Sequence, residues 1–146
     1  MNINYRCAEI QDEEELFVLA KKLATSYTLN KVDFSRIYAE ILSDENADLV
    51  IAEKDSRVIG YALSFHHSTF YANGVISWVE ELIVLHEFRG MKIGKNLMDL
   101  IEEKAQERGS KLIALATRRA SGFYKSIGYD ESAVYLKKTM KANYKS

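Results

Sequence analysis

The sequence predicts a mixed α/β fold, in which a β-sheet is covered by helices. Two observations lead to this class. Short runs rich in β-branched and aromatic residues alternate along the chain with longer segments whose apolar residues recur every three to four positions. In addition, Lys111 to Ala116 is a continuous apolar run, as expected for a central strand that is buried on both faces.

The first half of the chain is expected to contain one strand, two helices and a β-hairpin. Lys54-Asp-Ser-Arg57 separates two apolar runs and has the composition of a hairpin turn. Gly60, inside the second run, indicates a bulge or the close approach of another backbone. In order, the expected elements are a strand at Asn4–Glu9, helices at Gln11–Thr25 and Phe34–Leu42, and strands at Leu49–Glu53 and Val58–Phe65.

The second half is expected to alternate strands and helices. Asn73-Gly74 is one of the strongest short turn signals, and Gly109 stands where a glycine commonly ends a helix. The complete order is β-α-α-β-β-β-α-β-α-β, followed by a loose tail at residues 141–146. The elements are a strand at Val75–Leu85, a helix ending at Arg108, the strand Lys111–Ala116, a short helix at Ala120–Ile127 and a last strand at Ser132–Met140.

Length and composition limit the kind of protein this is. The 146 residues predict a single domain, residues 1–146, with a core large enough to fold alone. The net charge of −1 gives no electrostatic reason to expect a nucleic acid partner. The chain lacks an apolar run long enough to span a membrane and an apparent secretion signal, so a cytoplasmic protein is expected. Cys7, the only cysteine, is expected to be a small buried residue of the first strand.

The turn at Glu87 to Lys95 is the most informative stretch. It connects a strand to a helix, so the free backbone N–H groups and the helix dipole favour a bound anion such as a phosphate. Gly90 and Gly94 allow the main chain to approach that anion closely. The spacing fits neither the dinucleotide-binding fingerprint nor the nucleoside triphosphate loop. The turn is therefore interpreted as a pyrophosphate site, with Arg89, Lys92 and Lys95 adding positive charge.

Three segments together resemble the GNAT superfamily of N-acetyltransferases. Arg89-Gly-Met-Lys-Ile-Gly94 is similar to the family pattern [Q/R]-x-x-G-x-[G/A], with Lys92 at the first glycine position, which is tolerable if that residue keeps an ordinary backbone conformation. Glu80-Glu-Leu-Ile-Val84 resembles the acid-bearing strand before this turn, and Ala120 to Tyr129 resembles the segment A-x-x-[FL]-Y-x-x-x-G-[FY]. Thr117 stands where an asparagine is common.

The resemblance implies a GNAT-like fold and direct transfer of an acetyl group from acetyl-CoA to a primary amine. The second half of the chain is most similar to members that acetylate small amines, such as polyamines and aminoalkylphosphonates. A small-molecule amine is therefore the expected partner, and the oligomeric state is left open, a homodimer included. The implied cofactor-binding residues are Leu82, Ile83, Val84, Arg89, Gly90, Met91, Lys92, Ile93, Gly94, Lys95 and Thr117.

The same resemblance assigns the catalytic residues. An amine with a pKa near 10 is mostly protonated at neutral pH and needs a base. Glu80 matches the position of the acidic base, and Glu81 is the alternative base or a substrate contact. Adjacent strand residues point to opposite faces unless a bulge intervenes. Tyr124 matches the general acid, where a hydrogen bond to the developing thiolate is the more favourable role.

The remaining candidates concern the acceptor. Tyr27 and Trp78 are candidate walls of an acceptor pocket, together with Glu81. His66 and His67 are adjacent, and neighbouring strand residues cannot easily chelate one ion, so no metal is expected. Two other functions stay open: an enzyme that acetylates proteins or peptides, and a non-catalytic module that binds acyl-CoA.

Overall fold

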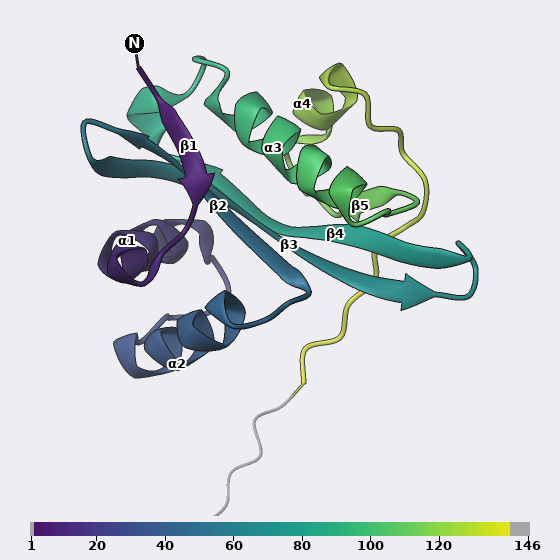
Figure 1. The fold of residues 1–146 in the computed structure, drawn as a ribbon, viewed down its shortest axis with the longest axis horizontal. Coiled ribbons are helices and arrows are strands. Elements are labelled where there is room, and N and C mark those ends of the chain that lie inside the picture. The colour runs from purple at the N-terminus through teal and green to yellow at the C-terminus, as the bar shows by residue number, and fades with distance from the viewer. Residues whose placement is uncertain (1, 141–146) are drawn as a thin grey trace, which may run out of the picture. The chain divides into compact units, whose positions relative to one another are not determined.

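The computed structural model describes residues 2–140, which divide into two compact units. The first unit ends at Leu115 and the second begins at Ala116. The first contains a five-stranded sheet in the order β1-β2-β3-β4-β5 (Figure 1). The predicted α/β class is therefore confirmed. The strands are β1 (Asn4–Cys7), β2 (Ala47–Lys54), β3 (Arg57–Thr69), β4 (Gly74–Val84) and β5 (Ile113–Leu115).

The first four strands form an antiparallel sheet, and β5 pairs in parallel with β4. Both predicted turns connect strands of this sheet. Asp55 and Ser56 have positive φ angles of 51° and 64° between β2 and β3, and Asn73 has φ 55° before β4. Left-handed residues match the twist of a tight hairpin, and Asn and Asp adopt this conformation more readily than most residues.

Helices cover both faces of the sheet. α1 (Glu13–Leu23) and α2 (Lys31–Leu42) lie on one face, and α3 (Ile93–Glu107) lies on the other (Figure 1). Two 3₁₀ turns, Ile10–Asp12 and His86–Phe88, precede α1 and α3. α2 begins earlier than predicted because the Asn30 side chain accepts a hydrogen bond from the Asp33 N–H at 2.9 Å. α3 packs on the sheet through a stripe at helical spacing: Ile93, Leu97, Met98, Ile101 and Ala105.

Gly60 serves both purposes proposed from the sequence. The pairing of β2 with β3 shifts beside it, so that Ile59 has no partner on β2. A Cβ at Gly60 would lie 2.9 Å from the carbonyl oxygen of Ile83 on β4. Any larger residue would therefore push β3 away from β4, the strand that carries the candidate base.

Two expectations about the edges of the sheet are wrong. Cys7 is exposed, because β1 is an edge strand. β5 is also an edge strand within residues 2–140, and its residues are half-buried rather than central. A continuous apolar run indicates that both faces of a strand are covered, but it does not indicate that the strand has a neighbouring strand on each side. Helices or loops can cover the two faces of an edge strand.

The second unit contains one helix, α4 (Ser121–Ser126), inside the predicted range Ala120–Ile127. The last strand predicted at Ser132–Met140 is wrong, because no strand forms after α4 up to residue 140. Val134 and Leu136 are 83% and 85% exposed. Alternation of apolar side chains favours a strand only where a neighbour pairs its backbone, and this segment has none within the described chain. The predicted tail, 141–146, lies outside the described residues.

No helix within residues 2–140 combines the length and the apolar character that crossing a membrane requires.

A buried polar network connects β2, β3, β4 and the end of α3. His66 is buried, and its Nε2 lies 2.8 Å from Asp48 Oδ2 while its Nδ1 shares a hydrogen bond of 2.6 Å with Ser77 Oγ. Arg108 donates from Nε to the same Asp48 oxygen at 2.9 Å. Burial is the largest effect on His66 and lowers its pKa. His66 is thus held neutral inside the fold, whereas its neighbour His67 is exposed.

This network predicts a loss of stability in weak acid. The folded pKa of His66 lies below its ordinary value of about 6.5, so the unfolded chain binds the proton first. The stabilisation that the neutral His66 gives to the fold is complete above a pH of about 6.5. It declines as the pH falls below 6.5, by at most about 1.4 kcal/mol per pH unit. The free energy of unfolding, measured with urea at several pH values between 7.5 and 5.5, should depend less steeply on pH in His66→Gln than in the wild type. His67→Gln should keep the wild-type slope; equal slopes in all three proteins would contradict this role.

Candidate active site

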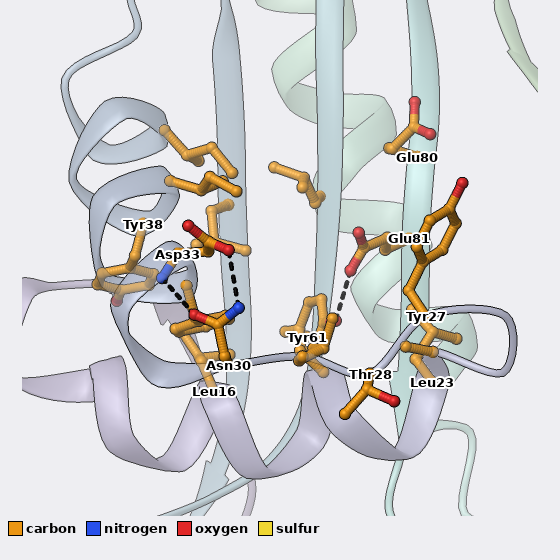
Figure 2. A pocket seen from close by; sticks show the side chains of 18 residues that line it. Leu16, Leu23, Tyr27, Thr28, Asn30, Asp33, Tyr38, Tyr61, Glu80 and Glu81 are labelled. Carbon is orange, nitrogen blue, oxygen red and sulfur yellow. Dashed lines mark hydrogen bonds between the residues drawn. The ribbon is translucent and has the colours of Figure 1, made fainter. Parts of the chain in front are cut away.

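A cavity of about 520 Å³ opens between the helices α1 and α2 and one face of the sheet (Figure 2). Its walls come from α1, the segment between α1 and α2, α2 itself, and the strands β2, β3 and β4. Most of the lining is aliphatic or aromatic. The polar groups that line it include the side chains of Tyr27, Asn30, Asp33, Tyr61, Glu80 and Glu81.

Both candidate bases line this cavity because β4 has a bulge at Glu80. Leu63 of β3 pairs with Glu81, and the next residue, Ser64, pairs with Val79, so Glu80 has no partner on β3. An extra residue interrupts the alternation of side chains along a strand. Two consecutive carboxylates therefore line the same cavity, which a regular strand would not allow.

The two carboxylates have different surroundings. Glu81 is half-buried, and its Oε1 accepts a hydrogen bond of 2.6 Å from the Tyr61 hydroxyl (Figure 2). Burial raises the pKa of Glu81, the Tyr61 hydrogen bond opposes this rise, and the charge of Glu80 adds to it. Burial also raises the pKa of Tyr61, so its phenol keeps its proton and stays a donor. Glu80 is exposed, which leaves its carboxylate accessible from the cavity.

The acceptor residues expected from the sequence divide into two groups. Tyr27 lines the cavity together with Glu80 and Glu81 (Figure 2). Trp78 is not among the described residues that line it. His66 belongs to the buried network described above, and within residues 2–140 no cluster of three His, Cys, Asp or Glu side chains is arranged to hold a metal ion.

Tyr61 and Asp33 were not found from the sequence. Asp33 appeared to precede its helix, although the Asn30 cap places it in the first turn of α2. Tyr61 appeared as one of several apolar residues of a hairpin strand. The register of the β3–β4 hairpin could have identified Tyr61. Counting residues along both strands from the Asn73-Gly74 turn brings Leu63 opposite the glutamates, and Tyr61 lies two residues from Leu63 on the same face of β3.

The glycine turn before α3 presents a row of unpaired amides. Within residues 2–140, no protein acceptor bonds the N–H groups from Gly90 to Lys95, and the first amide bonded to the turn is that of Asn96, to the Lys92 carbonyl at 3.0 Å. Gly90 has φ 81°, and no atom lies within 4 Å of where its Cβ would be. Arg89 and Lys92 are exposed beside these amides. This arrangement suits an anionic ligand.

Lys92 departs from the backbone conformation on which the sequence interpretation depended. It adopts the left-handed region, with φ 63° and ψ 16°, and it is the N-cap of α3. A side chain in this region costs about 1–2 kcal/mol, a cost that glycine avoids. The left-handed conformation at this position therefore explains why the family pattern has a glycine there. This chain makes the turn with a lysine in a strained conformation.

The pairing of β4 with β5 ends before β4 reaches the glycine turn. Their pairing ends at Val79 and Leu115, whereas β4 continues to Val84. From Glu80 onward, the edge of β4 that faces away from β3 has no strand partner among the described residues. Peptide groups on that edge are available to an extended polar ligand, as the sequence interpretation requires of Leu82 to Val84.

The second unit holds two further candidates, Thr117 and Tyr124. Thr117 Oγ1 accepts a hydrogen bond from the Ala120 N–H at 3.1 Å, a contact that an asparagine side chain could also make. Tyr124 is half-buried, and its ring centroid lies 4.9 Å from that of Phe123 and 5.9 Å from that of Tyr129. Burial raises the pKa of Tyr124, so its phenol remains protonated at neutral pH.

Comparison with known proteins decides the family. A model of the acetyltransferase (GNAT) family matches residues 9–129. The chain belongs to this family. An aminoalkylphosphonate N-acetyltransferase of Salmonella typhimurium is 31% identical over 135 residues, which cover 87% of this chain and 84% of that protein. An uncharacterized N-acetyltransferase of Archaeoglobus fulgidus is 32% identical over 106 residues, covering 69% and 71%.

Solved GNAT structures confirm the fold. Glucosamine-6-phosphate N-acetyltransferase of Arabidopsis thaliana superposes with a TM-score of 0.85 at 20% identity, covering 97% of this chain and all of that one. The GNAT resemblance seen in the sequence is thus confirmed, and the protein is an N-acetyltransferase. The family generally uses acetyl-CoA as the acyl donor, and its members act on amines.

The strain at Lys92 predicts that glycine stabilises the fold. Lys92→Gly should raise the free energy of unfolding by about 0.5–1 kcal/mol, because relief of the left-handed conformation exceeds the greater chain entropy of glycine. Chemical denaturation measures this difference. Lys92→Ala is the matched control, since it also removes the charge but keeps a strained Cβ, and its stability should stay close to that of the wild type. A Gly variant no more stable than the Ala variant would contradict the assignment.

Proposed function

We propose that this enzyme transfers the acetyl group of acetyl-CoA to the primary amine of a small molecule that binds in the cavity beneath α1 and α2. One observation carries the proposal: an apolar cavity of about 520 Å³ has two neighbouring carboxylates, Glu80 and Glu81, in its β4 wall. A volume in this range is typical of pockets that enclose small ligands. The name of the Salmonella relative, which describes a small amine acceptor, agrees with this choice.

The donor would bind to the backbone of β4 and of the glycine turn. The free amides of Gly90 to Lys95 suit the diphosphate of coenzyme A, and Arg89 and Lys92 add positive charge. The unpaired edge of β4 at Leu82 to Val84 suits the amides of a pantetheine arm. When bound, acetyl-CoA supplies a thioester whose C–S bond breaks as the amine nitrogen bonds to the carbonyl carbon. Thr117 is proposed as a further contact from the second unit.

Glu80 is proposed as the base that deprotonates the amine. Its carboxylate is exposed at the cavity, so it can take the proton directly or through one water molecule. Glu81 is held by the Tyr61 hydroxyl, which orients it to hold the ammonium group before proton transfer. The extra residue at the bulge makes this division of roles possible, because it brings both side chains to the same cavity.

Tyr124 is proposed to donate a hydrogen bond to the departing thiolate. Transfer of the phenolic proton to a thiolate is uphill by about 2 kcal/mol from the ordinary pKa values alone. Burial raises the pKa of Tyr124 and makes this transfer harder still. A hydrogen bond to the developing negative charge needs no such transfer and still lowers the barrier.

The choice between a small acceptor and a protein acceptor can be tested by thiol release. We expect saturable release of coenzyme A with a panel of small primary amines, and much slower release with peptides that carry a free N-terminus or a lysine. The physical reason is the cavity, whose volume of about 520 Å³ suits a small amine. Faster turnover of peptides than of every small amine would overturn the proposed acceptor class.

The assignment of the base predicts a change in the pH–rate profile. Glu80→Gln should lower kcat/KM about 100-fold or more near pH 7, with a smaller loss near pH 10, where the free amine is already abundant. Glu81→Gln is the comparison and should chiefly raise KM for the amine. A Glu80→Gln profile that runs parallel to the wild type, together with a pH-dependent loss in Glu81→Gln, would transfer the role of base to Glu81.

A further inference from the structure

The walls of the cavity carry charge of only one sign. Three of its lining residues are acidic, namely Asp33, Glu80 and Glu81, and no lysine, arginine or histidine of the described first unit, residues 2–115, lines it. The nearest basic partner of an acidic lining residue is Arg36, which lies 3.4 Å from Asp33 and 3.5 Å from Glu40. Arg36 is therefore already engaged by two carboxylates on the exposed side of α2.

Most of the remaining lining is apolar, and it comes from α1, α2 and the sheet. Aliphatic side chains from α1, α2 and the sheet face the same space as the ring of Phe34. They include Leu16, Leu23, Ile37, Ile41, Leu49 and Leu63. Ile37 and Ile41 bring the lining contributed by α2 into this group. Such a lining stabilises hydrocarbon and offers no donor with a full positive charge.

This combination discriminates between acceptors. An ammonium group gains from the carboxylates of Glu80 and Glu81, and it offsets the cost of burying Glu81. A phosphonate or carboxylate elsewhere on the acceptor would lose its hydration against the mostly apolar lining. It would also lie near negative charges, without a cation of the cavity lining to compensate its own charge. The cavity therefore selects against an anionic group.

We propose that the acceptor is an alkylamine or arylalkylamine whose body is apolar and carries no anionic group. This rests on the proposed acetyl transfer and narrows its acceptor. It also separates this enzyme from its Salmonella relative, whose name describes an acceptor that carries a phosphonate. The difference lies in the charge of the cavity wall and needs no change in the donor site.

Matched pairs of acceptors test the proposal by thiol release with acetyl-CoA in excess. The pairs are hexylamine with 6-aminohexanoic acid, 2-phenylethylamine with phenylalanine, and propylamine with 3-aminopropylphosphonate. In each pair, the member without the anion should have a kcat/KM higher by about 100-fold or more, because close like charges are costly at a desolvated site. An anionic member that equals or exceeds its partner would overturn the proposal.

A charge introduced into the wall gives a second test. Thr28 lines the cavity and is exposed, so Thr28→Arg should place a cation there without disturbing the core. The preference for hexylamine over 6-aminohexanoic acid should fall at least about tenfold in this variant. Thr25→Arg is the matched control, because Thr25 is exposed on the same segment but does not line the cavity. Its preference should match the wild type; equal preferences in all three proteins would count against the proposal.

Calorimetry separates failure of this inference from failure of the proposed function. Hexylamine and coenzyme A are each titrated into the protein alone, and 6-aminohexanoic acid is titrated as the comparison. Binding of hexylamine but not of the acid supports the inference even if no transfer is detected. Absence of coenzyme A binding would overturn the proposed function. Absence of hexylamine binding at millimolar concentration, or equal binding of the acid, would overturn the inference while leaving the transfer of acetyl to other amines intact.

Discussion

One extra residue in the antiparallel pairing of β3 with β4 determines where the two carboxylates of the proposed site lie. In a regular strand, Glu80 and Glu81 would face opposite sides of the sheet. One carboxylate would then enter the apolar layer between the sheet and α3, where residues such as Leu97 and Met98 are fully buried. An unpaired charge in such a layer is costly. The bulge at Glu80 avoids this cost and brings both carboxylates to the cavity on the other side.

The donor side of the proposed site depends on the backbone more than on side chains. Unpaired amides in the glycine turn and an unpaired edge of β4 are features that many sequences can supply. This explains how the turn can form with Lys92 in place of a glycine, at the expense of local strain. The proposed acceptor side is different, because the selectivity that we propose for it comes from particular side chains. Related enzymes can therefore share a donor site while their cavities differ in charge.

The half-buried Glu81 is held by contacts that begin in the backbone of the sheet. The Tyr61 hydroxyl fixes one carboxylate oxygen, and the preceding residue, Gly60, allows β3 to approach the backbone of Ile83 on β4 closely. Tyr27, from the segment between α1 and α2, lines the same cavity as this pair (Figure 2). A backbone contact in the core thus supports the geometry of a charged group at the cavity wall.

Most of the secondary structure and the family were determined by the sequence, because local signals specify them. The hairpin at Asn73-Gly74, the stripe on α3 and the segments around Arg89 and Tyr124 depend on residues close together in the chain. Only the tertiary structure decided that Glu80 and Glu81 share a cavity, that Tyr61 and Asp33 join them, that Lys92 is left-handed and that Ser132–Met140 forms no strand. These features depend on strand register, on strand pairing and on contacts between elements that are distant in the sequence. The local preferences of individual residues carry little information about such contacts.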